Sequence, residues 1–165
     1  MTTSRAATLH SQRDLLSLGY LMKRAHSLTA SVVEPALMDR GFTYVQYVVL
    51  SRVRQEKAVT PKDIATQLRH NSGALSRVID QLVHRGLLTR VRRDHDRRKV
   101  ELRLTPAAHG TIDGLVELVA DRLNRALVNF SGSDLQDLQR LLVKLATTLH
   151  SAIEPAMPRS VSARS

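Results

Sequence analysis

Two short segments of alternating apolar and polar residues, at positions 88–92 and 100–104, flank the side chains best suited to bind a charged partner. Alternation with a period of two is typical of paired strands, so we expect a two-stranded hairpin. The tip between the segments, residues 93–99, is almost entirely charged and too polar to pack on other elements. Such a tip is suited to lie along a polyanion, and its candidate contacts are Arg97, Arg98 and Lys99.

The acidic residues inside this tip have two interpretations. Asp94, His95 and Asp96 are residue types that bind metal ions, but strand-like alternation would splay their side chains, and five cationic residues surround them. We therefore expect no metal site. The alternative is a structural role, in which an acidic residue pairs with a neighbouring arginine and holds the tip in shape, with Asp96 as the favoured brace.

The positive charge of the chain is concentrated around this hairpin. The net charge is +10, and residues 69–103 contain ten Lys or Arg against four Asp or Glu, a net of +6. This excess indicates an acidic partner. None of the five aromatic residues lies in this stretch, whereas surfaces that bind single strands or RNA usually need aromatic rings for base stacking. Double-stranded DNA is therefore the favoured partner.

Several other classes of protein are disfavoured by the residues that are missing or scattered. The chain has no cysteine, which removes disulfides, thiolate metal sites and thiol-based redox sensing. The histidines lack metal-ligand spacing, and we find no glycine-rich phosphate loop or activated serine elbow, so we expect neither an enzyme nor a cofactor. With no membrane-length apolar run and no signal-peptide core near the start, we expect a cytoplasmic protein without a membrane partner.

Two helices are expected before the basic region. The first begins near Ser11 and is ended or kinked by Pro35, because proline lacks an amide donor and clashes with the preceding turn. Gly41 separates it from a second helix over residues 43–56. The apolar side chains expected to face inward from this second helix are Val45, Val48, Val49 and Val53.

A helix-turn-helix pattern directly precedes the hairpin. Thr60 and Asp63 form a capping pair around Pro61, and a second helix runs from a cap at Ser72 to a stop at Gly86. In such a pair the second helix projects its polar side into the major groove, where base edges differ in donors and acceptors. The residues expected on that outer face are Asn71, Ser72, Gly73, Ala74, Ser76 and Arg77.

Two long helices are expected after the hairpin. Thr105 and Pro106 start one that continues to about Val128, and Ser133 with Gln136 would cap the other. No domain-sized linker interrupts residues 1–165, and residues 151–165 read as a flexible tail. The last helix carries leucines spaced alternately by three and four, a coiled-coil seam that needs a partner: either a second copy of the chain or an intramolecular bundle. These leucines are Leu135, Leu138, Leu142, Leu145 and Leu149.

The order of these parts resembles the multiple-antibiotic-resistance regulator (MarR) family of winged helix-turn-helix repressors, over about residues 15–150. The matching motifs are Phe42-Thr43-x-x-Gln46-Tyr47; Thr60-Pro61-x-Asp63-Ile64-Ala65; Ser76-Arg77-Val78-Ile79-Asp80-x-Leu82; Arg85-Gly86-Leu87-Leu88; and Asp96-Arg97-Arg98 with Leu102-x-Leu104-Thr105. One departure is that Gly73 and Ala74 stand where the family often has Ser or Thr, which leaves open whether these two positions contact bases.

The resemblance implies a mainly α fold, with a DNA-binding region over residues 43–104 and dimerisation helices over 11–41 and 105–150. Leu15 and Leu18 would join the leucine seam in a homodimer that reads a pseudo-palindrome. Independently, a two-fold dimer would place its recognition helices about one DNA turn, roughly 34 Å, apart. Family members are commonly released from DNA by small aromatic or phenolic ligands, whereas the lack of cysteine excludes the thiol-based, peroxide-sensing branch. The candidate ligand-binding residues are Tyr20, Arg24, His26, Tyr44 and Tyr47.

Together these features predict a sequence-specific, duplex-binding transcriptional regulator, a repressor relieved by a small effector. Two alternatives remain open from the residues alone. One is an architectural protein that binds DNA without sequence preference, and the other is a helical protein–protein adaptor whose basic charge is incidental.

Overall fold

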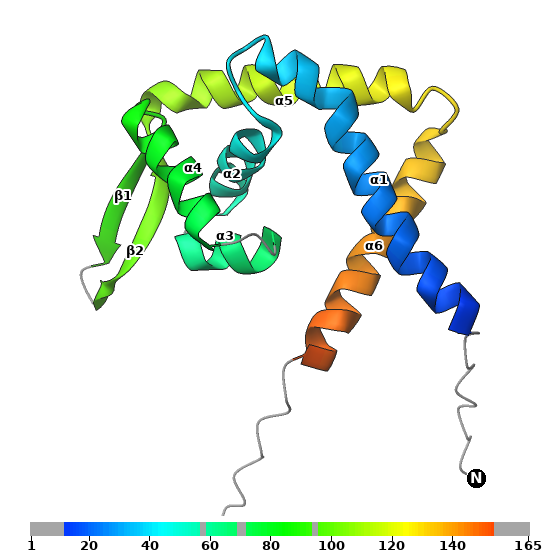
Figure 1. Cartoon of the computed structure of the whole chain (residues 1–165). Coiled ribbons are helices and arrows are strands. Elements are labelled where there is room, and N and C mark those ends of the chain that lie inside the picture. The colour runs from blue at the N-terminus through cyan, green and yellow to red at the C-terminus, as the bar shows by residue number, and fades with distance from the viewer. Residues whose placement is uncertain (1–11, 57–58, 69–71, 94–95, 154–165) are drawn as a thin grey trace, which may run out of the picture. The chain divides into compact units, whose positions relative to one another are not determined.

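The structure is a computed structural model that describes residues 12–56, 59–68, 72–93 and 96–153, with side chains described for all of these except 12–16, 67, 68, 72, 93 and 96–99. The chain divides into two compact units, Met1–Ala126 and Leu127–Ser165. The fold is mainly helical with one two-stranded antiparallel sheet, as predicted (Figure 1). The elements are α1 (Gln12–Met38), α2 (Tyr44–Gln55), α3 (Pro61–Leu68), α4 (Ser72–His84), β1 (Leu88–Arg93), β2 (Asp96–Leu104), α5 (Pro106–Ala126) and α6 (Gly132–Ile153).

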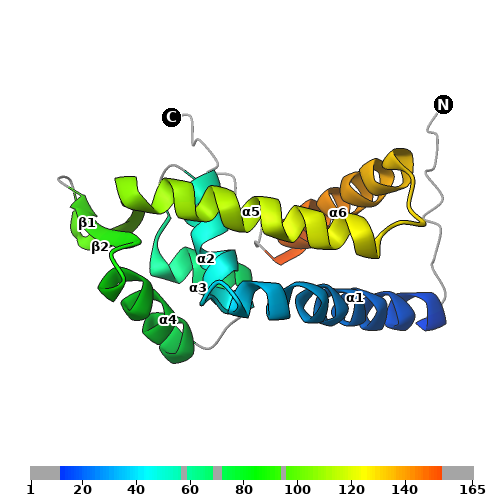
Figure 2. The same cartoon turned by 90° about the horizontal axis from the view of Figure 1, so that it is seen from above.

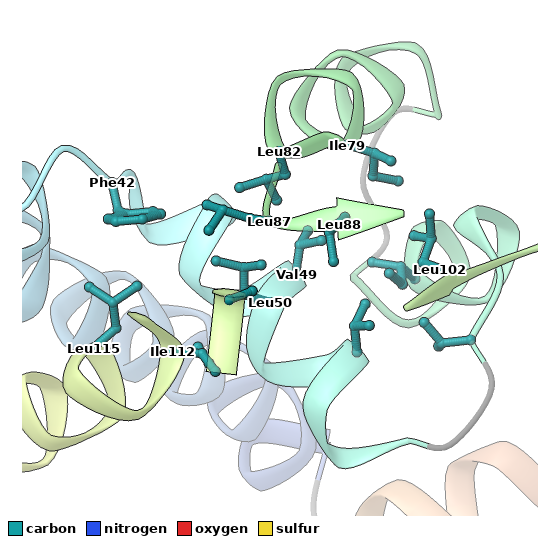
Figure 3. Close-up of a cluster of buried hydrophobic side chains, with 14 of the residues drawn as sticks. Phe42, Val49, Leu50, Ile79, Leu82, Leu87, Leu88, Leu102, Ile112 and Leu115 are labelled. Atoms are coloured by element: carbon teal, nitrogen blue, oxygen red, sulfur yellow. The ribbon is translucent and has the colours of Figure 1, made fainter. Parts of the chain in front are cut away.

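The first unit is built on one hydrophobic core to which α1 to α5 and both strands contribute (Figure 3). Its centre contains Leu50 from α2, Ile79 from α4 and Ile112 from α5, all fully buried. The prediction for α2 was partly wrong, because Val45 and Val48 are only half-buried, whereas Leu50 and the polar Gln46 are buried. The physical reason is that α2 packs against α1, α4, α5 and β2, so its buried face is set by several neighbours rather than by its β-branched residues.

Both predicted glycine stops are confirmed, and both have the same hydrogen-bond pattern. Gly41 and Gly86 have φ angles of 73° and 68°, the left-handed region that favours glycine. After α4, the Gly86 amide donates to the Val83 carbonyl (2.9 Å) and the Leu87 amide to the Leu82 carbonyl (3.0 Å). This is a Schellman motif, which satisfies carbonyls at the end of the helix and turns the chain into β1.

We expect Gly86→Ala to lower the free energy of unfolding by about 1–2 kcal/mol. The cost is conformational, because no atom lies within 4 Å of where the new Cβ would stand, while the φ of 68° disfavours any L side chain. Urea unfolding measures the change. Gly110→Ala is the matched control, since Gly110 lies inside α5 with equally open space, and there alanine should stabilise by about 0.5–1 kcal/mol. Equal effects of the two substitutions would contradict the argument.

Of the two outcomes predicted at Pro35, an end of the first helix is wrong. α1 continues through Pro35 to Met38, and the Asp39 amide donates to the Pro35 carbonyl (3.1 Å). The proline removes one hydrogen bond to the carbonyl of Ser31, but both residues are exposed, so water can satisfy that carbonyl. In the first unit α5 lies against α1 (Figure 2).

The hairpin is longer than expected, and its charged tip is correspondingly shorter. β1 pairs with β2 from Leu88–Leu104 to Arg92–Val100, followed by an irregularity and a pair between Arg93 and Asp96. The expected alternation holds for Leu88 and Leu102, which are buried. Glu101 departs from it, because this residue is only 3% exposed and its carboxylate lies 3.5 Å from the Arg103 guanidinium.

Three hydrogen bonds attach the base of the hairpin to its neighbours. The Leu102 amide donates to the Val59 carbonyl just before α3 (2.8 Å), forming a bridge that the sequence did not reveal. The Thr105 amide donates to the Leu87 carbonyl (3.1 Å), and the Thr105 hydroxyl donates to the Gly86 carbonyl (2.7 Å). The threonine predicted as a helix cap therefore joins the start of α5 to the residues that follow α4.

The second unit contains α6, whose predicted cap was wrong. The capping pair is Ser131 with Asp134, not Ser133 with Gln136: the Ser131 amide donates to the Asp134 carboxylate (2.8 Å) and the Asp134 amide donates to the Ser131 hydroxyl (3.2 Å). α6 also continues to Ile153, into the expected tail, of which residues 154–165 lie outside the described part of the chain. Among the helices that the structure describes, none is long and apolar enough to cross a membrane.

Candidate nucleic-acid interface

The helix α4 is strongly two-sided, which is what a recognition helix requires. Leu75, Ile79 and Leu82 are at most 1% exposed and hold the helix on the core. The opposite face contains four of the predicted DNA contacts, all of them exposed: Gly73, Ala74, Ser76 and Arg77. The burial of one face and the exposure of the other allow α4 to enter a groove without disturbing the fold.

Several predicted DNA contacts lie outside what the structure describes. Asn71 is outside the described residues. Asp94 and His95 of the tip, which were not predicted to contact DNA, are outside them too. The backbone at Ser72 belongs to α4 and that of residues 96–99 to β2, but their side chains are not described. The predicted roles of Ser72, of Arg97, Arg98 and Lys99, and of Asp96 as a brace therefore stay predictions.

The hairpin is braced against α4 by an ion pair that sequence reasoning missed. The Arg90 guanidinium on β1 lies 2.6 Å from the Asp80 carboxylate on α4. Asp80 stands one turn after Ser76 and Arg77, so an unpaired carboxylate there would repel phosphate. Pairing with Arg90 offsets that charge. An acidic residue on the polar face of a helix, shortly before a basic strand, was the signal in the sequence.

The helix α3 adds two polar side chains that were not predicted. Lys62 and Thr66 are exposed and, together with Ser76 of α4, contribute to an open depression of about 570 Å³ between the two helices. In a helix-turn-helix the first helix crosses the DNA backbone, where lysine and hydroxyl side chains contact phosphate oxygens. Lys62 and Thr66 are therefore additional candidates for positioning contacts.

Three of the five predicted ligand-binding residues lie close together, where α1 passes the start of α2. The ring centroid of Tyr44 lies 5.9 Å from that of His26 and 6.4 Å from that of Tyr47. The Tyr44 amide donates to the Glu34 carboxylate of α1 (3.1 Å), which joins the two helices. Tyr20 and Arg24 are exposed on α1, and the ring contacts of the described residues join only the other three.

Burial raises the pKa of the Tyr44 phenol above its ordinary value of 10.0, with smaller contributions from Tyr47 and Glu34. The folded protein thus holds this proton more tightly than the unfolded chain does. The stability that results is complete below pH 10.0 and is lost as the pH rises through the folded-state pKa. We expect urea midpoints to fall with pH in this alkaline range, and less steeply in Tyr44→Phe. Tyr20→Phe, which removes an exposed phenol, is the control; equal slopes in all three proteins would contradict the prediction.

The predicted dimerisation leucines whose side chains are described are more exposed than the residues of the hydrophobic core. Leu138 and Leu142 are each 45% exposed, Leu149 is 50% exposed, and no residue of α6 is buried within the described chain. Leu135 and Leu145 are half-buried, Leu18 on α1 is 40% exposed, and the side chain of Leu15 is not described. Taken unit by unit, α1 and α6 each carry exposed apolar side chains.

Comparisons with known proteins agree with this arrangement. The model of the MarR family matches residues 42–100, which include α2, the helix-turn-helix and most of the hairpin. The organic hydroperoxide resistance transcriptional regulator of Bacillus subtilis is 32% identical over 117 residues, covering 71% of this chain and 78% of that protein. The multiple antibiotic resistance protein MarR of Escherichia coli is 26% identical over 133 residues, covering 80% and 92%.

A solved structure gives the same result in three dimensions. The crystal structure of a mutant E. coli MarR complexed with operator DNA superposes with a TM-score of 0.66 at 25% identity, covering 83% of this chain and 99% of that one. The relatives are transcriptional regulators rather than enzymes. The shared fold, the matched helix-turn-helix and the identity across most of the B. subtilis regulator show that this chain belongs to the MarR family.

Proposed function

We propose that this member of the family is a homodimeric repressor that binds a pseudo-palindromic operator and is released by a small aromatic or phenolic ligand. α4 would read bases in the major groove, and the hairpin would follow the phosphate backbone or enter the minor groove. The observation that carries the proposal is the exposed outer face of α4 beside a basic hairpin, in a chain similar to a regulator solved with its operator.

The charge distribution supports a division of roles between the two elements. Arginine and lysine at the hairpin are suited to phosphate contacts, which give affinity but little sequence information. Sequence preference would come from residues 73–77 of α4, where Arg77 has the donor geometry for a guanine edge. Gly73 and Ala74 have too little side chain for hydrogen bonds, so their contribution would be close approach or contact with a thymine methyl group.

The proposed effector site is the aromatic group of His26, Tyr44 and Tyr47. These rings lie within 6.4 Å of a neighbour. The Tyr44 phenol is protonated at physiological pH, since the ordinary pKa of 10.0 is far above neutral and burial raises the pKa further. A protonated phenol can donate a hydrogen bond to a carboxylate or phenolate, and the rings can stack on an aromatic ligand. This chemistry fits the ligand class that the family resemblance implies.

Competition binding tests the proposal. Labelled duplex from the region upstream of the gene is bound by the full-length protein and competed with random duplex of equal length, at several salt concentrations. We expect a preference of roughly a thousandfold or more. Benzoates and phenols added to the bound complex are expected to displace the upstream duplex.

Each other outcome contradicts a stated part of the proposal. Equal affinity for upstream and random duplex would favour an architectural DNA-binding protein. Absence of salt-dependent duplex binding would favour a protein–protein adaptor. If every benzoate and phenol fails to displace the duplex while the sequence preference is present, the effector class is wrong and the operator assignment stands.

A further inference from the structure

The end of α4 is attached to the turn between α1 and α2 by an arginine whose contacts lie within the protein. Arg85 follows the last residue of α4, and its Nη1 donates to the Gly41 carbonyl at 2.9 Å. The same guanidinium lies over the ring of Phe42, with its Cζ 4.0 Å from the ring centroid. This geometry combines a charge-assisted hydrogen bond with a cation–π contact, so it fixes both the position and the plane of the side chain.

A second contact joins the same two parts of the fold one turn earlier. Gln81 precedes Arg85 by four residues and therefore lies on the same face of α4. Its Oε1 accepts a hydrogen bond from Nε2 of Gln46 at 3.1 Å. Gln46 is 8% exposed, and its Oε1 accepts from the Thr43 amide at 3.0 Å within the cap of α2. The last turn of α4 is thus held at two points, by the α1–α2 turn and by the first turn of α2.

The turn that receives these contacts is itself firmly built. Gly41 closes α1 through the Phe42 amide, which donates to the Leu37 carbonyl (2.9 Å). Phe42 is 6% exposed and belongs to the core (Figure 3). Thr43 and Gln46 form a complete capping box at the start of α2. Arg85 and Gln81 therefore meet a rigid surface rather than a loose loop.

The anchored end of α4 is opposite its reading end. α4 has 13 residues, so it is about 20 Å long, and residues 73–77 lie in its first two turns. A tilt of a few degrees at the anchored end moves the first turn by about 1 Å, which is larger than the tolerance of a hydrogen bond to a base edge. Leu75, Ile79 and Leu82 hold α4 by apolar burial, which is non-directional. Directional contacts are needed to fix its orientation.

We propose that Arg85 and Gln81 are positioning residues for operator recognition, which set the direction of α4 through their contacts with Phe42, Gly41 and Gln46. The inference rests on the proposed function, because its consequence is sequence-specific DNA binding. It also assigns an exposed arginine in the basic region to a structural contact rather than to phosphate.

The test measures affinity for the preferred duplex and for random duplex over a range of salt concentrations, for the wild type, Arg85→Gln and Arg85→Lys. We expect both substitutions to weaken specific binding by roughly tenfold, with random-duplex affinity within about twofold of wild type and an unchanged salt slope. Lysine should fail to rescue because it lacks the planar guanidinium that stacks on Phe42. Arg125→Gln, which removes an equal charge from an arginine paired with Asp121 on α5, is the control and should bind as wild type.

A double-mutant cycle with Phe42→Leu checks that the effect passes through the ring. The loss in Arg85→Gln/Phe42→Leu should be no larger than the greater single loss, whereas additive losses would overturn the proposal. Thermal unfolding of each variant ensures that all are folded at the assay temperature. Full activity of Arg85→Lys with a reduced salt slope in Arg85→Gln would make Arg85 a phosphate contact and overturn the positioning role. If the wild type shows no sequence preference, the proposed function fails first, and this is seen before any variant is compared.

Discussion

Leu142→Asp is expected to convert the protein to a monomer and to weaken operator binding by about 10²- to 10⁴-fold. Leu142 lies in the middle of the leucine seam of α6 and is 45% exposed in the single chain. In the proposed dimer this side chain is covered by the partner, so the substitution would bury an unpaired carboxylate in an apolar interface. A monomer reaches only one half-site and loses the second, linked binding event. Light scattering gives the mass, and titration of the operator gives the affinity.

Thr147→Asp is the matched control for this substitution. Thr147 is exposed on the same helix, five residues further along and on the side away from the seam, so it receives the same charge without the interface. It should remain dimeric and bind the operator as wild type. A dimeric Leu142→Asp protein would refute the leucine seam as the interface, and a monomeric Thr147→Asp protein would show that any charge on α6 is disruptive.

Arg77→Ala is expected to weaken operator binding by about 1–3 kcal/mol per half-site and to relax the base preference at one position in each half-site. Arg77 is exposed on the outer face of α4, next to the exposed Ser76 and on the opposite side from Ile79. An arginine there can bind the two acceptors of guanine at once, which gives discrimination between bases. Binding to an operator library with single-base changes measures both quantities.

Arg98→Ala is the informative comparison. As a phosphate contact of the hairpin it should weaken binding to all duplexes by a similar factor and reduce the salt slope by about one unit per half-site. Arg77→Ala should instead leave binding to random duplex nearly unchanged. If the two variants lose affinity in the same way for every sequence, Arg77 contacts the backbone and base recognition must come from other residues of α4.

Helix boundaries could be predicted from sequence where one local signal stood alone. Thr60 and Asp63 cap α3 as expected, because the Thr60 amide donates to the Asp63 carboxylate (2.9 Å) and the Asp63 amide donates to the Thr60 hydroxyl (3.1 Å). Before α6 the sequence contains two overlapping candidate capping pairs. The pair Ser131–Asp134 forms rather than Ser133–Gln136, and a carboxylate is the stronger acceptor beside a positive helix end.

Burial of polar side chains could not be predicted in the same way. Gln46 and Glu101 belong to polar residue types that are mostly exposed, yet they are 8% and 3% exposed. Their burial depends on partners elsewhere: Gln46 meets Gln81, which is 35 positions away, while Glu101 lies on a strand whose neighbours include the bridge at Val59. Periodicity reports which residues share a face, but not which distant groups will satisfy a polar atom there.

The same difference holds for the candidate interface, where a helix face could be predicted from local spacing but contacts between distant residues could not. The outer face of α4 followed directly from helical spacing, because the apolar positions 75, 79 and 82 define the opposite side. The contacts that orient this face were missed. Arg90 reaches Asp80 across ten positions and Arg85 reaches Gly41 across 44, and both arginines were counted only as positive charge near DNA.

Because hydrogen bonds fix the base of the hairpin, the length of its outer end can change without changing the direction of α4. The base is hydrogen-bonded to Val59 just before α3 and to Gly86 just after α4, so these bonds fix its position. Beyond the Arg92–Val100 pair the structure describes one further pair between the two strands, Arg93 with Asp96. Insertions or deletions there would lengthen or shorten only the outer end of the hairpin, without changing the hydrogen bonds at its base. In the proposed complex such a change would alter how far along the DNA backbone the hairpin extends and would leave the half-site geometry unchanged.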